Sequence, residues 1–275
     1  MFNGAAYDWW NYSIFASSRR EATEGPLAET ASLDGGFRAE RANKGKNMLK
    51  RLFDVVVASL ALLVLAPLFA LVAILIKLDS RGPVFYRGVR VGRFGRPFRI
   101  YKFRTMVADA EKLGPSSTAA DDPRITRVGR WLRRFNLDEL PQFINVLKGE
   151  MSIVGPRPQV PWAVELYPEE ERKLVLSVRP GITDWATLWI RDEGALLKGS
   201  RDPDRDYLEK IDPIKRRLQI VYVQNRSLWM DLQIMVLTLK VHLFDRLFPS
   251  VGFRWLPKWV EEVANGVRDL QTWDR

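Results

Sequence analysis

A run of 22 residues without a charged side chain, Val55 to Ile76, constrains this chain more than any other feature. A helix rises about 1.5 Å per residue, so the run would reach roughly 33 Å, enough to cross a bilayer. The run is apolar on every face, which favours a membrane over the core of a soluble protein as its surroundings. It begins too late for a signal peptide. We therefore expect a membrane-embedded helix.

Two further features favour a helix over residues 46–81 that enters and leaves the bilayer on the same side. Pro67, which follows Ala66, lies mid-run, where a proline removes one backbone hydrogen bond and kinks a helix. Lys and Arg favour the cytoplasmic side of a membrane, and they flank the run at both ends. They are Arg41, Lys44, Lys46, Lys50 and Arg51 before it and Lys77, Arg81, Arg87, Arg90, Arg93, Arg96 and Arg99 after it. We expect a re-entrant helix-break-helix, with a single kinked crossing as the alternative.

Charge and composition narrow the function classes. The chain of 275 residues has 43 Lys and Arg against 33 Asp and Glu, a net charge of +10, which indicates an anionic partner. It has no Cys and one His, His242, which excludes Cys-based chemistry and multi-His metal sites. Gly88, Gly92 and Gly95 match no phosphate-binding glycine loop, and no nucleic-acid-binding motif is recognisable. Beside a membrane helix, lipid phosphate is a nearer partner than nucleic acid.

The rest of the chain is predicted to be mostly helical with a little strand, an α+β fold. Residues 83–106 alternate β-prone pieces with Gly and Arg, which predicts a twisted hairpin with a basic face. Residues 1–45 are expected to form a flexible extension, and residues 248–275, in which Trp side chains lie among charges, an interfacial amphipathic helix. Helices are expected over residues 125–135, 141–148, 160–178 and 211–247.

Two adjacent acids, Asp138 and Glu139, are the candidates for chemistry. A carboxylate at a helix start is favoured in its ionised form and would serve as a nucleophile or a metal ligand. The alternative is a structural role, because Asn136 followed three residues later by Glu139 matches a capping box. The surrounding basic residues favour a site for a phosphate group and a metal ion. These are Arg127, Arg130, Arg133, Arg134 and Arg157.

Several longer motifs occur along the chain in a specific order. They are Lys50-Arg-Leu-Phe-Asp54, Gly82-Pro-Val-Phe-Tyr86, Tyr101-Lys-Phe-Arg-Thr-Met106, Asp122-Pro-Arg-Ile-Thr126, Leu137-Asp-Glu-Leu-Pro-Gln142, Asn145-Val-Leu-Lys-Gly-Glu-Met-Ser-Ile-Val-Gly-Pro-Arg-Pro158 and Arg179-Pro-Gly-Ile-Thr183. With this ordered set the chain resembles, from Lys46 to about Leu247, the bacterial sugar transferase family, the monotopic phosphoglycosyl transferases. A single motif of this kind would be weak evidence, whereas the ordered set is highly specific.

The resemblance implies an enzyme of the bacterial inner membrane whose catalytic domain, residues 82–247, lies on the cytoplasmic face. Such an enzyme transfers a sugar-1-phosphate from a UDP-sugar to undecaprenyl phosphate among the membrane phospholipids, and so begins polysaccharide or glycoconjugate synthesis. The resemblance implies that Asp138 attacks the donor and forms a covalent phosphosugar, and that Glu139 helps to hold Mg²⁺. It also implies phosphate- or substrate-binding roles for Lys102, Arg104, Arg133, Arg157 and Asp231.

The sequence departs from the family pattern at two places. Ala66 stands where relatives often have Ser before the proline, and Gln219, Ile220 and Val221 occupy places where many relatives have an acid. Two alternatives stay open: a non-catalytic single-span membrane protein with a basic domain that binds nucleic acid or lipid, and an inactive scaffold of the same fold. The sequence does not decide the sugar, the pathway or whether the chain forms a homodimer.

Overall fold

The structure is a computed structural model that describes residues 33–190, 192–241 and 256–272, with side chains described between Asn47 and Gly266 inside these ranges. The chain divides into two units, Met1–Lys46 and Asn47–Arg275, and the packing described below is that of the second. The predictions for residues 1–32, His242 and residues 248–255 lie outside the described residues. The described part is mostly helical with three small two-stranded sheets, in agreement with the predicted α+β composition.

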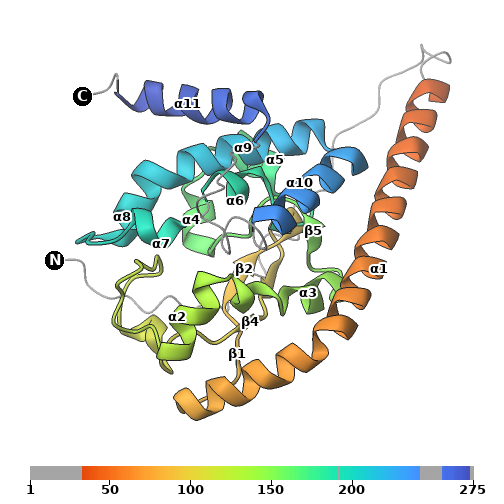
Figure 1. Cartoon of the computed structure of the whole chain (residues 1–275). Helices are drawn as coiled ribbons and strands as arrows, with labels where there is room; N and C mark the ends of the chain where they lie inside the picture. Colours follow the sequence, from red (N-terminus) through yellow and green to blue (C-terminus); the bar gives the residue numbers. More distant parts are fainter. Residues whose placement is uncertain (1–32, 191, 242–255, 273–275) are drawn as a thin grey trace, which may run out of the picture. The chain divides into compact units, whose positions relative to one another are not determined.

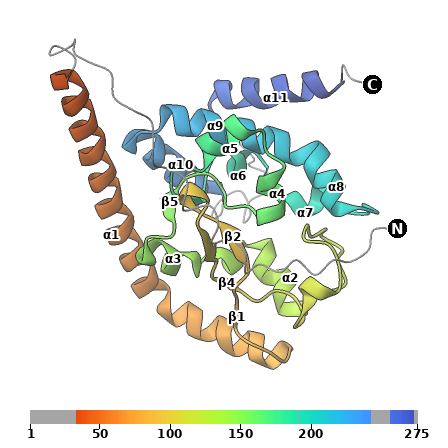
Figure 2. The same ribbon diagram turned by 180° about the vertical axis from the view of Figure 1, so that it is seen from behind.

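The apolar run lies inside helix α1 (Leu33–Asp79), which begins within the predicted N-terminal extension. From Asn47 to Asp79 this helix is long and apolar enough to cross a membrane. The helical turns continue on both sides of Pro67, so the expected break is not an interruption of the helix. α1 changes direction along its length in both views (Figure 1, Figure 2), and an internal proline is a usual cause of such a bend.

One face of α1 packs against the domain and another is exposed. Asp54, Ala58, Val72 and Ile76 are at most 2% exposed. Large apolar side chains cover the exposed face, and these include Met48, Leu49, Leu52, Val56, Leu60, Leu63, Val64, Leu71, Ile74 and Leu78. An apolar surface of this extent is unusual in water, and a lipid environment would cover it.

The predicted hairpin forms two successive antiparallel pairs. Strand β1 (Phe85–Tyr86) pairs with β4 (Lys102–Phe103), and β2 (Val89–Val91) pairs with β3 (Pro97–Arg99). Phe103 of β4 packs with Val72 and Ile76 of α1, so the C-terminal part of α1 contacts the hairpin. Leu132 of α2 (Arg127–Arg134) belongs to the same cluster. The hairpin thereby places Lys102 beside the segment that follows α2.

A pair of parallel strands was not predicted. β5 (Ser152–Val154) pairs with β6 (Gly181–Thr183) directly beside the turns expected at those places. The two backbones run so close that a Cβ atom on Gly181 would lie 2.1 Å from the amide nitrogen of Gly155. Only glycine permits this approach, which fixes where the chain leaves β5 towards Arg157.

The predicted helices are present with changed bounds. The helix expected over 160–178 is two helices, α4 (Pro161–Glu165) and α5 (Glu169–Val175), because Pro168 cannot continue the first one. The stretch expected over 211–247 contains α9 (Asp212–Asn225) and α10 (Leu228–Lys240). The remaining helices are α3 (Gln142–Lys148), α6 (Trp185–Trp189), α7 (Glu193–Leu196), α8 (Pro203–Asp206), a π-helical turn over Tyr207–Ile211 and α11 (Lys258–Thr272).

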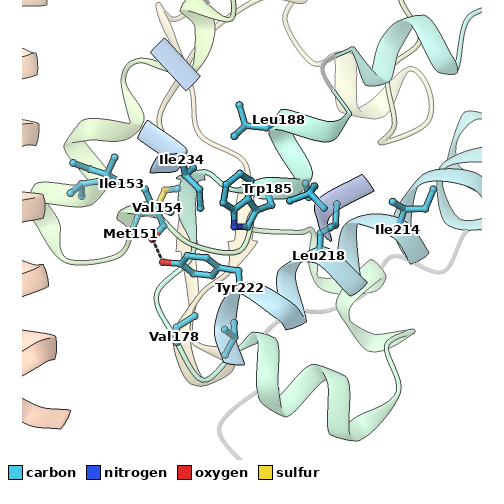
Figure 3. Close-up of a cluster of buried hydrophobic side chains, with 14 of the residues drawn as sticks. Met151, Ile153, Val154, Val178, Trp185, Leu188, Ile214, Leu218, Tyr222 and Ile234 are labelled. Carbon is cyan, nitrogen blue, oxygen red and sulfur yellow. Dashed lines mark hydrogen bonds between the residues drawn. The ribbon is translucent and has the colours of Figure 1, made fainter. Parts of the chain in front are cut away.

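The main core lies between α6, α9, α10 and the β5–β6 pair (Figure 3). Trp185 of α6 and Tyr222 of α9 are its largest fully buried side chains, each 1% exposed. α11 lies along α9 and contributes buried Val260 and Ala264, while its Trp259 ring meets Trp185 edge-on with 5.3 Å between centroids. The apolar side chains of α11, which lies in the segment predicted to form an interfacial helix, therefore pack in the protein core.

Buried polar contacts at the start of the apolar run fasten α1 to this core. Lys50 Nζ lies 2.6 Å from Asp231 Oδ2 of α10, and the Tyr222 hydroxyl donates to Asp231 Oδ1 over 2.7 Å. Asp54 accepts from the Ser152 hydroxyl at 2.8 Å and from the backbone N–H of Ile153 at 3.2 Å. Asp231 is 1% exposed, so Lys50 and Tyr222 take the place of water as partners of its carboxyl oxygens.

We expect Asp231→Asn to lower the free energy of unfolding by about 2–3 kcal/mol, because the variant leaves the Lys50 ammonium facing a neutral amide. The measurement is thermal unfolding of the full chain in detergent. Asp121→Asn is the matched control, since Asp121 is exposed. Equal stability of Asp231→Asn and the control would contradict a structural role for the Lys50–Asp231 pair.

Candidate active site

Glu139 is held by two cations from distant parts of the chain. It lies at the end of the 3₁₀ turn Leu137–Glu139, between α2 and α3. Lys102 Nζ of β4 donates to Glu139 Oε1 over 2.8 Å. The guanidinium of Arg157 binds both carboxylate oxygens, through Nη2 to Oε1 and through Nη1 to Oε2 at 2.8 Å. Burial raises the pKa of Glu139, but Arg157 and Lys102 outweigh it and hold that pKa well below its usual range.

The neighbouring carboxylate of Asp138 is buried but not clamped. It is 8% exposed, and it makes no hydrogen bond to the residues that the structure describes. Burial raises the pKa of Asp138; Lys102 opposes this rise, Glu139 adds to it and Arg133 opposes it. The sequence predicted that a helix start would favour the ionised form of Asp138, but the pKa of Asp138 is shifted in the opposite direction. α3 begins only at Gln142, and loss of water around the buried carboxyl is the largest influence on its pKa.

The capping alternative for this acid pair is wrong. Asn136 has a left-handed backbone with φ of 52°, and its side chain does not cap the turn that follows. The carboxylate of Glu139 is engaged by Lys102 and Arg157, so it does not reach back to close a capping box. The two acids therefore belong to a charged cluster.

A second layer of polar contacts positions Arg157. Its backbone N–H donates to Asp184 Oδ2 over 3.1 Å, and Asp184, which is fully buried, caps α6 by accepting from the backbone N–H of Thr187 at 2.7 Å. Gln219 Nε2 also donates to Asp184 Oδ2, over 3.1 Å. Sequence reasoning missed Asp184, although an Asp directly before an apolar helix is a recognisable cap.

The structure gives a local account of the missing acid at 219–221. Gln219 contacts Asp184. An amide side chain can donate a hydrogen bond to the Asp184 carboxylate, whereas an ionised acid at position 219 would repel that carboxylate.

The charged group continues beyond Arg157. Lys215 of α9 is 1% exposed and pairs with Glu193 over 2.8 Å. Lys215 also donates to the Tyr207 hydroxyl over 3.1 Å. Glu193 also lies within electrostatic reach of Arg157, so positive and negative side chains alternate from Lys102 through Glu139 and Arg157 to Lys215.

The structure brings together only part of the predicted site. Lys102, Asp138, Glu139 and Arg157 form one group. Arg133 lies within electrostatic reach of Asp138 and donates through Nε to the Thr105 hydroxyl over 2.9 Å. The side chains of this group come from β4, α2, the 3₁₀ turn and the loop after β5.

The other predicted residues lie in different surroundings. The Arg104 guanidinium donates to the backbone oxygens of Ser80, at 2.9 Å, and Arg81, at the end of α1. These contacts give Arg104 a structural task, and its phosphate-binding role stays a prediction. Asp231 binds Lys50 and Tyr222, and the predicted break residues Ala66 and Pro67 are exposed along α1.

The carboxylates of the charged group offer few ligands for a magnesium ion. Within the described ranges no three His, Cys, Asp or Glu side chains gather as a metal cluster. Mg²⁺ does not need one, since it is commonly bound by one or two carboxylates together with waters and substrate phosphates. Asp138 and Glu139 therefore fit a magnesium site that a bound diphosphate would complete.

The two acids are expected to affect stability in opposite ways. Glu139→Gln removes the anion that Arg157 and Lys102 share, which we expect to lower the free energy of unfolding by about 2–3 kcal/mol. Asp138→Asn removes a desolvated charge without losing a hydrogen bond within the described residues, so stability should be unchanged or raised. Thermal unfolding of both variants in detergent tests this, and a larger loss in Asp138→Asn would contradict it.

Comparison with known proteins places these residues in one family. A family model described as bacterial sugar transferase matches residues 45–245 of the chain. This range includes the charged group around Glu139, the hairpin, the parallel strand pair and α1 from its apolar run onward. The match therefore covers the parts of the chain from which the site is built.

Three curated relatives illustrate the similarity. The chain is 43% identical over 210 residues to the undecaprenyl-phosphate glucose phosphotransferase of Komagataeibacter xylinus, covering 72% of this chain and 36% of that protein. It is 39% identical over 197 residues to the UDP-N-acetylgalactosamine-undecaprenyl-phosphate N-acetylgalactosaminephosphotransferase of Aeromonas hydrophila, covering 71% and 44%. It is 42% identical over 200 residues to the exopolysaccharide production protein PSS of Rhizobium leguminosarum bv. phaseoli, covering 68% and 91%. The chain thus spans less than half of the first two relatives.

Proposed function

Because the chain belongs to the bacterial sugar transferase family, we propose that it transfers a sugar-1-phosphate from a UDP-sugar to undecaprenyl phosphate. The names of its relatives support this reaction, and they include both glucose and N-acetylgalactosamine donors. The observation that carries the proposal is the contrast between the two acids: Glu139 is clamped by cations, whereas Asp138 makes no hydrogen bond within the described residues.

In the first step, a carboxylate oxygen of Asp138 attacks the β-phosphorus of the UDP-sugar. The bond from that phosphorus to the oxygen bridging the two phosphates breaks, and the bridging oxygen leaves with UMP. The product is a phosphosugar joined to Asp138 through a mixed anhydride. A covalent intermediate divides one difficult displacement into two easier ones. Burial of Asp138 strips its carboxylate of water, which leaves it poorly stabilised and reactive.

In the second step, a phosphate oxygen of undecaprenyl phosphate attacks the same phosphorus. The bond to Asp138 breaks, the carboxylate is regenerated, and the lipid carries a diphosphate-linked sugar. Both steps develop charge on the phosphoryl oxygens, which cationic groups fixed in advance can stabilise. Lys102 and Arg157 supply such groups, since Glu139 and Asp184 hold them in position.

The residues that would hold Mg²⁺ are Glu139 and Asp138, together with the diphosphate of the donor. When bound, the ion would supply additional positive charge against the phosphates. The cationic partners of Glu139 lower its pKa and favour its ionised form, which is the form that binds a metal ion.

We expect Asp138→Asn to reduce UMP release from UDP-glucose and UDP-N-acetylgalactosamine by at least about a thousandfold, because the amide is not a nucleophile. The assay uses purified full chain with Mg²⁺ and undecaprenyl phosphate. Asp121→Asn, an exposed substitution, is the matched control. Substantial UMP release by Asp138→Asn would contradict the assignment, and absence of turnover by the wild type with every UDP-sugar tried would favour the non-catalytic alternatives.

We further propose that α1 is re-entrant. Polar contacts fasten both ends of its apolar run to the same unit: Asp54 near the start binds β5, and Asp79 at the end accepts from the backbone N–H of Val128 at 2.9 Å. A crossing helix would place these ends on opposite sides of an apolar layer about 30 Å thick. The contacts therefore support a helix that returns to the side it entered from.

The topology can be tested with single cysteines, because the natural chain has none. We expect Asn47→Cys and Arg81→Cys both to react with a membrane-impermeant maleimide only after the inner face of the membrane is opened, since both ends lie on the cytoplasmic side. Labelling of intact spheroplasts tests this. Labelling of one of the two positions from outside would show a crossing helix instead.

A further inference from the structure

A second basic site lies where the apolar run of α1 begins, apart from the group around Glu139. We call it the basic hollow, an open concavity whose charged lining is Lys50, Arg51, Arg93, Arg179, Arg226 and Asp54. Five of these side chains are basic and one is acidic. None of them belongs to the charged cluster that the reaction uses, so the hollow requires a separate explanation.

Two of the basic side chains are committed to the fold. Lys50 is paired with Asp231 at 2.6 Å. Arg51 donates to the backbone oxygens of Val146 at 2.6 Å and Leu147 at 3.0 Å, at the C-terminal end of α3. The remaining three arginines carry the excess charge of the hollow.

Arg93, Arg179 and Arg226 converge without an acidic partner. Arg93 donates from Nε to the backbone oxygen of Ser177, and Arg179 from Nε to that of Gly149, each over 3.0 Å. In the part of the chain that the structure describes, Arg226 makes no hydrogen bond or ion pair, and none of the three pairs with a carboxylate. Burial and the charges of Arg179 and Arg226 lower the pKa of Arg93. Three half-buried like charges from separate segments are unfavourable unless an anion joins them.

The surroundings of the hollow favour a lipid as the source of that anion. On α1, Met48, Leu49 and Leu52 next to Lys50 and Arg51 are apolar and more than half exposed. On α10, Trp229 follows Arg226 by three residues and is 70% exposed. A Trp beside arginines is typical of the head-group layer, where acyl chains can contact apolar side chains while a phosphate meets the cations.

We propose that the basic hollow binds the phosphodiester head group of an anionic membrane phospholipid, through Arg93, Arg179 and Arg226. The bound lipid would neutralise the three arginines and hold the beginning of the apolar run at the depth of the head groups. This site goes beyond the proposed reaction and does not depend on it, because neither Asp138 nor Glu139 takes part.

The test measures binding of a fluorescent phosphatidylglycerol and a fluorescent phosphatidylcholine to the full chain in neutral detergent. We expect the wild type to bind phosphatidylglycerol more tightly than phosphatidylcholine, and the ratio of the two affinities is its preference. Arg226→Gln should reduce the preference about fivefold, and Arg93→Gln combined with Arg226→Gln about twentyfold, since each arginine near a lipid surface contributes separately. The control combines Arg96→Gln and Arg217→Gln, which removes the same charge at two exposed positions outside the hollow.

Several outcomes would overturn the proposal. An unchanged preference for phosphatidylglycerol in the double variant would exclude the hollow as the binding site. An equal loss of this preference in the control variant would show that only the net charge of the protein matters. Full displacement of the lipid by equimolar inorganic phosphate or undecaprenyl phosphate would show that a phospholipid is not the specific ligand. The single variant Arg226→Gln separates loss of lipid binding from loss of the fold, because the Arg226 side chain makes no hydrogen bond in the described part of the chain. An unchanged midpoint of thermal unfolding would verify that the variant is folded.

Discussion

An apolar run of helix whose two ends are both fastened to one polar domain is the constraint on which the rest of the structure depends. The Lys50–Asp231 pair and the Asp54 contacts hold the start of this run, while Asp79 and Arg104 fix its end against α2 and the residues after α1. Its buried face then packs in the core of the domain, and its exposed apolar face suits a lipid environment. The charged group around Glu139 and the basic hollow lie on the domain to which this helix is fastened.

The acid pair shows how two adjacent carboxylates acquire different properties. Glu139 shares its charge with Lys102 and Arg157, so it stays ionised and organises the cations. Asp138 is buried beside them, and burial raises its pKa. Environment, rather than residue type, gives the two acids pKa values that are shifted in opposite directions. The contacts of Asp184 to the Arg157 backbone extend this organisation into the core.

Much of the fold followed from local pattern, and the ordered motifs identified the family that the family model confirms. The apolar run, the hairpin and most helices were predictable because periodicity and prolines act locally. The β5–β6 pair was not, since each strand has three residues and their pairing depends on a close approach of Gly155 and Gly181. Arg104 was assigned to phosphate by its motif, whereas its partners at the end of α1 lie 23 and 24 residues away in sequence. Contacts of this kind cannot be read from spacing.

The central claim is that Asp138 becomes covalently phosphorylated by its donor. The most direct measurement is mass spectrometry of the full chain, rapidly quenched after mixing with a UDP-sugar that it turns over and Mg²⁺, without lipid acceptor. We expect a mass increase equal to one phosphosugar on the peptide that contains Asp138, and we expect this increase to disappear when undecaprenyl phosphate is added before the quench. Normal turnover with lipid, together with no adduct on that peptide at any quench time, would contradict it.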